Sequence, residues 1–139
     1  MATWHSEILI TTTPLQAPAK SWNSRAGATV DFWGVVRTLE HGREISGIDY
    51  EVHHAMARHQ MEMIARGAGD EFDLQEVTLH HRVGFVAAGE ASLFLRVASA
   101  HRDAAYEGSA WIVAELKKKV PIWKRPVFVR QSESAPARE

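Results

Sequence analysis

The stretch Ala98–Arg125, ASAHRDAAYEGSAWIVAELKKKVPIWKR, predicts a helix that carries basic residues at both ends. Its small and apolar side chains recur at the i, i+4, i+7, i+11 spacing of one helical face, namely at Ala105, Ser109, Ile112 and Leu116. Ser99 and His101 precede this run, and Pro121 cannot continue it. We therefore expect a helix over residues 102–119.

The charges in this stretch have both a structural and a functional explanation. Asp103 in the first turn and the lysines at 117–119 in the last turn match the helix dipole. Lys124 and Arg125 are not explained in this way, because they follow the apolar segment 121–123, which would hold the chain against the protein body. Two cations on such a segment indicate a negatively charged ligand.

The remaining sequence predicts one α+β domain. With 139 residues, 45% of them hydrophobic, the chain is long enough to bury its own core. We expect a second helix from 54 to about 67, and strands at 6–12, 27–37, 45–52, 74–83, 91–98 and 127–129. Short connections favour a mainly antiparallel sheet with two main helices. The domain is expected to span residues 1–130, followed by a polar tail at 131–139.

Two local details of the strands are also predicted. The strands at 27–37 and 45–52 are expected to form a hairpin or to be near neighbours, because a polar segment around Gly42 connects them. Gly34 is expected to mark a bulge or a close backbone approach. Residues 84–90 are expected to form a turn region.

Composition excludes several classes of function. The chain contains no cysteine, so a thiol nucleophile, a cysteine-ligated metal and a disulfide scaffold are excluded. No secretory leader and no run of about 18 apolar residues is recognisable, and we expect a cytoplasmic protein without membrane contact. The net charge of −1 argues against the alternative of a nucleic-acid-binding module that uses the basic clusters.

The histidines raise the alternative of a metal site, at His53, His54 and His59 or at the pair His80 and His81. Neighbouring residues in a strand point to opposite faces, so the pair cannot easily hold one ion, and no HExxH motif is present. Neither a glycine-rich phosphate loop nor a GxSxG motif occurs. We expect no metal and no cofactor.

The basic residues instead indicate a local anion site, formed by Arg37, His101, Arg102, Lys117, Lys124 and Arg125. Free N–H groups at the start of the helix favour an anion, and a nearby arginine adds a bidentate contact. A helix over residues 102–119 is about 25 Å long, so its two ends cannot easily contact one small ligand within a single chain. Either the ligand is elongated, the helix bends, or two subunits complete the site.

Several motifs, taken in order, resemble the large, catalytic subunit of molybdopterin synthase over nearly the whole chain. They are FWGVVR at 32–37, Tyr50 and Glu51 ahead of a methionine-rich helix, HRVG at 81–84 with Gly89 and Glu90, SAHR at 99–102 with AYE at 105–107, and Lys117 followed by PIWKR at 121–125. Each motif is short, but their order and spacing together are specific for this family.

The resemblance implies an α/β-hammerhead-like fold and a sulfur transfer reaction. Such subunits convert cyclic pyranopterin monophosphate into the dithiolene molybdopterin, in the biosynthesis of molybdenum cofactor. The sulfur comes from a small ubiquitin-like partner that ends in a Gly-Gly thiocarboxylate, so the absence of cysteine is intelligible. Family members form a homodimer within a heterotetramer, and residues of both subunits build each pocket.

The resemblance also implies roles for individual residues. Lys117 and Lys124 would be catalytic, either by stabilising the anionic thiocarboxylate, by forming a transient covalent adduct, or by moving protons. Arg37, His101 and Arg102 would hold the phosphate and the pterin. The full set of expected substrate contacts is Val35, Val36, Arg37, His101, Arg102, Lys117, Lys124, Arg125 and Pro126.

One position departs from the family pattern. Where the family commonly continues the Trp-Lys-Lys/Arg segment with a glutamate, this chain has Pro126. A missing carboxylate changes the surroundings of the lysines, and proline fixes φ and removes an N–H. The alternative is therefore a non-catalytic relative that binds a pterin phosphate or the small sulfur-carrier protein.

Overall fold

The computed structural model describes residues 4–19 and 24–130, and within these ranges the predicted α+β class is confirmed. The predicted tail at 131–139 lies outside the described residues. No helix in the described ranges is long and apolar enough to cross a membrane. The elements in chain order are β1 (His5–Thr11), β2 (Ala28–Val35), β3 (Leu39–Glu40), β4 (Arg43–Val52), α1 (His54–Phe72), β5 (Leu74–Arg82), β6 (Gly84–Ala87), β7 (Ala91–Ser99), α2 (Arg102–Lys119) and β8 (Ile122–Phe128).

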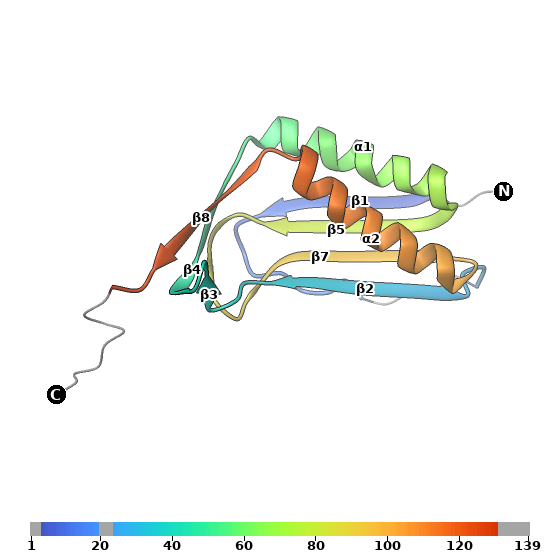
Figure 1. Cartoon of the computed structure of the whole chain (residues 1–139). Coiled ribbons are helices and arrows are strands. Elements are labelled where there is room, and N and C mark those ends of the chain that lie inside the picture. Colours follow the sequence, from blue (N-terminus) through green and yellow to red (C-terminus); the bar gives the residue numbers. More distant parts are fainter. Residues whose placement is uncertain (1–3, 20–23, 131–139) are drawn as a thin grey trace.

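The main sheet has the strand order β1, β5, β7, β2, and both helices cover one of its faces (Figure 1). β1 runs parallel to β5, whereas β5 and β2 both pair with β7 in an antiparallel manner. The face of α2 predicted from the helical spacing is the face that packs on the sheet. The core between the sheet and the helices includes Met61, Ile64, Val77, Leu79, Leu95, Val97, Ala105, Ile112 and Leu116.

A smaller sheet lies at one end of the main sheet (Figure 1). Its central strand β4 pairs antiparallel with β6 and with β8, and β3 pairs with the start of β4. Only Val120 and Pro121 separate α2 from β8, so the C-terminal end of α2 is tied to this sheet. Its buried side forms a second core cluster of Val36, Ile45, Ile48, Tyr50, Val83 and Val86.

The helix α1 is longer than the sequence predicted, because it continues to Phe72 instead of ending near Gly67. Gly69 is buried inside the helix, where a Cβ atom would collide with the ring of Trp4. The helix ends at Asp73, which has a left-handed φ of 54° and whose N–H donates to the carbonyl of Gly69. The glycine is therefore required for close packing and does not act as a helix stop.

Three strand predictions were wrong in their details. β2 pairs with β7 and not with β4, residues 84–87 form β6 instead of a turn, and β8 begins at Ile122 instead of at 127. The first part of β8 was not predicted, because Pro126 lies within the strand and proline argues against a strand. Within the described residues β8 pairs only with β4, and proline is tolerated in such an edge strand. The irregularity expected at Gly34 is confirmed by a register shift between Gly34 and Val35.

On the face of the main sheet opposite the helices, the buried Arg96 forms an ion pair with the more exposed Asp31. Arg96 is 5% exposed, and its Nε and Nη2 donate to the two carboxylate oxygens of Asp31 at 2.7 and 2.9 Å. Its Nη1 donates to the carbonyl of Pro18 at 3.1 Å. The contact with Pro18 links the segment before β2 to the centre of the sheet. The contact with Asp31 matters for stability, because a buried cation is costly without its partner.

Replacing Asp31 by alanine should destabilise the fold by about 2 kcal/mol, because the buried Arg96 guanidinium then loses the carboxylate to which it donates two hydrogen bonds. The measurement is urea-induced unfolding, with a lower midpoint and an unchanged slope. The matched control is Glu62→Ala, since Glu62 and its partner Arg58 on α1 are both about half exposed. That change should cost about 0.5 kcal/mol or less. Equal costs for the two variants would contradict the assignment.

Candidate active site

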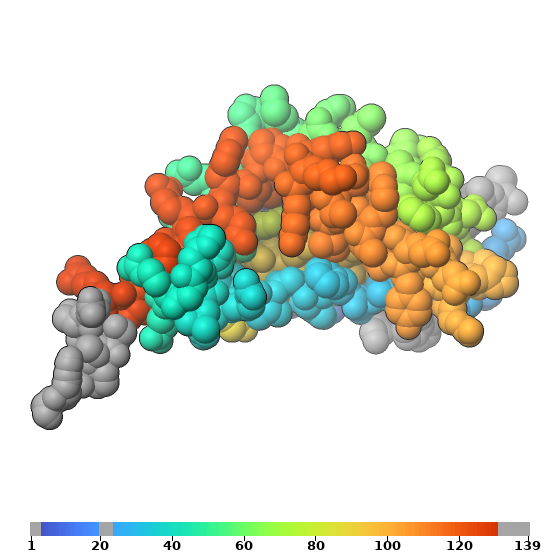
Figure 2. Space-filling view, viewed as in Figure 1, coloured from blue at the N-terminus to red at the C-terminus, as the bar shows by residue number. Residues whose placement is uncertain are grey.

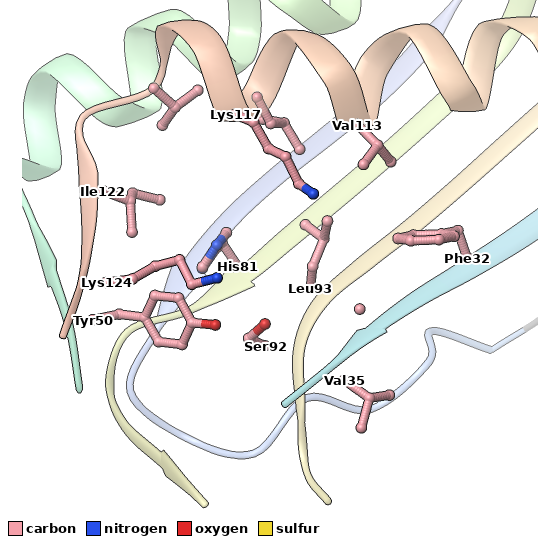
Figure 3. Close-up of a pocket in the computed structure, with 13 residues that line it drawn as sticks. Phe32, Val35, Tyr50, His81, Ser92, Leu93, Val113, Lys117, Ile122 and Lys124 are labelled. Atoms are coloured by element: carbon pink, nitrogen blue, oxygen red, sulfur yellow. The ribbon is translucent and has the colours of Figure 1, made fainter. Parts of the chain in front are cut away.

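A pocket of about 440 Å³ lies between the C-terminal end of α2, the start of β8 and the main sheet (Figure 3). Figure 2 shows α2 and β8 above the sheet, with yellow atoms of the sheet visible in the hollow between β8 and β2. The walls are largely apolar and include Phe32, Val35, Leu93, Val113, Leu116 and Ile122. The polar lining consists of Tyr50, His81, Ser92, Lys117 and Lys124.

Lys117 lies on the pocket-facing side of α2 because of the helical period. Val113 and Leu116 line the same pocket at i−4 and i−1, and the Lys117 side chain points into it (Figure 3). The next two lysines are paired elsewhere: Lys118 and Lys119 contact the carboxylate of Glu115 at 3.5 and 2.8 Å. Within the described residues, Lys117 itself forms no ion pair.

Lys124 reaches the pocket because of strand alternation. Ile122 and Lys124 of β8 line the pocket, while Trp123 between them turns to the other face of the smaller sheet. Arg125 on that other face donates from Nη2 to the Glu51 carboxylate at 2.8 Å. In the described part of the chain, Lys124 has no carboxylate partner, so the pocket receives two unpaired ammonium groups.

His81 of β5 contributes a neutral imidazole to the pocket. Its Nδ1 lies 2.8 Å from the carbonyl oxygen of Arg82, which can only accept, so Nδ1 carries the hydrogen. Burial lowers the pKa of His81 below its ordinary value of 6.5, although the Arg82 carbonyl opposes this effect. The neighbouring His80 faces the other side of the sheet and hydrogen-bonds to Glu7 at 2.7 Å. The pair therefore points to opposite faces, as the strand alternation predicted.

Tyr50 and Ser92 complete the polar side of the pocket. The ring of Tyr50 meets the ring of His81 edge-on, with centroids 5.3 Å apart. Burial raises the pKa of Tyr50, with a smaller opposing effect from its hydrogen bond with Ser92. Tyr50 therefore remains a neutral phenol at physiological pH.

A single chain brings together only part of the site predicted from the sequence. Val35, Lys117 and Lys124 line the pocket, whereas Val36 is buried in the second core cluster. The other predicted contacts are absent from its lining: Arg37, His101, Arg102, Arg125 and Pro126. His101 and Arg102 are exposed at the start of α2, about 25 Å along the helix from Lys117.

The sequence analysis missed three polar residues of the pocket, His81, Tyr50 and Ser92. His81 was weighed as a metal ligand and stands in the HRVG motif, but no catalytic or binding role was predicted for it. Within the described ranges no three histidine or carboxylate side chains gather to hold an ion. Strand alternation alone places the two histidines on opposite faces of the sheet. It could not decide which face carries the pocket, because this depends on how α2 and β8 close over the sheet.

Comparisons with known proteins identify the family of this chain. The family model described as MoaE protein matches residues 10–119. The molybdopterin synthase catalytic subunit of Pyrococcus abyssi is 40% identical over 105 residues, covering 76% of this chain and 71% of that protein. The protein of the same name from Oryza sativa subsp. indica is 39% identical over 103 residues, covering 74% of this chain and 53% of that protein. The match therefore spans about half the length of the rice protein.

Solved structures show the same architecture. Molybdopterin synthase from Staphylococcus aureus superposes with a TM-score of 0.80 at 27% identity, covering 91% of this chain and 93% of that chain. A complex of subunits 1 and 2 of the molybdopterin-converting factor from Helicobacter pylori gives a TM-score of 0.64 at 17% identity, covering 95% and 97%. The second likeness concerns the fold alone.

The neutral state of His81 should make the stability of the fold depend on pH. The unfolded chain takes up a proton at His81 near pH 6.5, whereas the folded chain does so only at lower pH, so stability should fall as the pH decreases below 6.5. His81→Gln should remove this part of the pH dependence. Urea unfolding of both chains between about pH 8 and about pH 5 measures it. Identical pH slopes for the two chains would show that burial does not hold the imidazole neutral.

Proposed function

This chain belongs to the MoaE protein family, and we propose that it is the catalytic subunit of a molybdopterin synthase that works in the cytoplasm. It transfers sulfur from the thiocarboxylate of a small ubiquitin-like subunit to cyclic pyranopterin monophosphate, which yields the dithiolene molybdopterin. One observation carries this proposal: Lys117 and Lys124, from different elements, direct unpaired ammonium groups into one pocket.

The pocket suits the two reactants that the proposal requires. A pterin is flat and largely apolar on its faces, and the walls offer Phe32, Leu93 and Ile122. A thiocarboxylate and a phosphate are anions, which two ammonium groups attract strongly where apolar walls exclude water. The partner's Gly-Gly tail is narrow enough to enter such a pocket, because it lacks side chains.

Sulfur transfer moves negative charge, and the lysines are placed to stabilise it. The anionic thiocarboxylate sulfur attacks a carbon of the pterin side chain, and charge then develops on the oxygen that leaves this carbon. Two ammonium groups in the same pocket would stabilise both the attacking thiocarboxylate and the leaving oxygen without having to reorganise. Two such transfers supply the two sulfur atoms of the dithiolene.

We further propose that a second copy of the chain completes each pocket. Arg37, His101 and Arg102 are the expected phosphate contacts, yet none of them lines the pocket of its own chain. His101 and Arg102 are exposed at the far end of α2 and are available to a neighbouring subunit. A homodimer with one small subunit bound to each copy then forms a heterotetramer.

The alternative of a non-catalytic relative rests on Pro126. This residue lies in β8 opposite Ile48 and is absent from the pocket lining. Both lysines keep their positions in the pocket with proline there, which favours the catalytic proposal over a pterin-binding or carrier-binding relative without activity.

Lys117→Ala and Lys124→Ala should each reduce sulfur transfer by about 100-fold or more, because each removes one of the charges that stabilise the reacting anion. The assay combines the chain with thiocarboxylated small subunit and pterin precursor, and measures the dithiolene product. Lys118→Ala is the matched control, since Lys118 is paired with Glu115 and should stay within about twofold of the unchanged chain. Full activity in both pocket variants would refute the assigned chemistry.

Mixing two inactive variants tests whether the site is shared between subunits. If Lys117 and Arg102 of one pocket come from different chains, dimers mixed from Lys117→Ala and Arg102→Ala chains contain one intact pocket. Random exchange should then restore about one quarter of full activity, since about half of the dimers are mixed and half of their pockets are intact. Each variant alone stays inactive or binds substrate weakly. No recovery after verified exchange would place both residues in the same chain's pocket.

A further inference from the structure

His81 has a free basic nitrogen and lines the pocket of the proposed reaction. Its Nδ1–H is engaged by the Arg82 carbonyl at 2.8 Å, so the lone pair of the neutral ring lies on Nε2. The ring is held from the side by Tyr50, at a centroid distance of 5.3 Å. It lines the same pocket as Lys117 and Lys124 (Figure 3). The tautomer and the orientation are thus fixed before any ligand binds.

The other polar groups of the pocket are unsuited to accept a proton. The two lysines enter as ammonium cations, which are donors only. Tyr50 and Ser92 carry neutral hydroxyl groups, and burial raises the pKa of Tyr50. No aspartate or glutamate is among the lining residues in the described part of the chain. The imidazole of His81 therefore offers the basic lone pair of this site.

The proposed reaction requires such a group at one step. When the thiocarboxylate sulfur bonds to a carbon of the pterin, it remains bonded to the acyl carbon of the partner's tail, and the two molecules are joined as a thioester. The partner is released only when an oxygen nucleophile replaces sulfur on the acyl carbon. Water is that nucleophile, and it attacks well only if a base removes its proton.

We propose that His81 is the general base that cleaves this thioester, with Nε2 accepting the proton of the attacking water. A C–O bond forms at the acyl carbon and the C–S bond breaks, so the tail leaves as a carboxylic acid and sulfur stays on the pterin as a thiolate. The carboxylic acid then loses its proton to solvent, and no electron transfer is involved. This inference rests on the proposed function, whose sulfur donor supplies the thioester.

The groups around His81 are compatible with a neutral, basic imidazole. Lys117 from α2 and Lys124 from β8 line the pocket with it, and Tyr50 faces it from β4. The guanidinium of the adjacent Arg82 donates to Glu90 at 2.8 Å, so this cation is neutralised by a partner. Burial lowers the pKa of His81 and so favours its neutral form, and a bound anion in the pocket would compensate the imidazolium that forms during the step.

The test follows the complex of this chain with its thiocarboxylated small subunit and pterin precursor. In His81→Gln, turnover should fall about 100-fold, and the thioester between tail and pterin should accumulate in samples quenched with acid and analysed by mass spectrometry. Turnover should recover as the pH rises, because hydroxide replaces the lost base. His81→Asn, whose side-chain amide still offers an N–H toward the Arg82 carbonyl, should show the same behaviour if the basic nitrogen matters.

The matched control is His80→Gln, since His80 is the neighbouring histidine and faces Glu7 on the other side of the sheet. It should turn over within about twofold of the unchanged chain and accumulate no thioester. The inference is overturned if His81→Gln keeps full turnover, if it slows without accumulating the thioester, or if the tail instead accumulates as an amide on a pocket lysine. An unchanged chain that makes no product overturns the proposed function itself, which is a distinguishable result.

Discussion

The antiparallel pairing of β8 with β4 is the constraint on which the pocket depends. In this register Lys124 lies opposite Tyr50 and Arg125 lies opposite Asp49. Since side chains alternate along a strand, one cation of the KR pair faces the pocket and the other faces outward. The N–H of His53 also donates to the carbonyl of Pro121 at 3.3 Å, which ties the connection between α2 and β8 to the start of α1. The position of Lys124 is therefore a property of the sheet rather than of a loop.

Carboxylates decide which of the clustered cations remain available. Glu115 engages Lys118 and Lys119, and Glu51 engages Arg125. The two lysines left without a partner among the described residues are those that line the pocket. Exposed ion pairs add little to stability, so the value of these pairs lies in orienting side chains away from the reactants. The basic residues at 117–125 look alike in the sequence, but in the structure some are held in ion pairs and only Lys117 and Lys124 are available to a ligand in the pocket.

Much of the fold could be predicted from local pattern, and much of the site could not. The spacing of Ala105, Ile112 and Leu116 predicted the buried face of α2, and the bulge at Gly34 followed from a glycine in a bulky strand. The full lengths of α1 and β8 were missed because glycine often ends a helix and proline often interrupts a strand. Here Gly69 is required for packing under the ring of Trp4, and Pro126 lies in an edge strand, where it breaks no ladder.

The site shows the same limit more clearly. Lys117 and Lys124 could be singled out by motif resemblance, whereas Tyr50 and His81 stand in motifs of the same resemblance that implied no role for them. These two residues and Ser92 come from three different strands. His81 and Ser92 meet through the pairing of β5 with β7, Tyr50 reaches His81 from β4 of the smaller sheet, and α2 and β8 close the pocket beside them. No spacing rule within one segment encodes that closure. Arg37, His101 and Arg102 are absent from the pocket lining of a single chain. For His101 and Arg102 the length of the predicted helix had already indicated this separation from Lys117.

Only two residues link α2 to β8, so the direction in which Lys124 points depends on the exact length of this link. Inserting or deleting a single residue between Lys119 and Ile122 would shift β8 by one position along β4, and every side chain of the strand would exchange faces. Arg125 would then point into the pocket and Lys124 would point to solvent, although the charge and the fold class of the protein would be unchanged. Natural variation in length is accordingly expected to be tolerated in the polar turns at the other edges and to be excluded from this link.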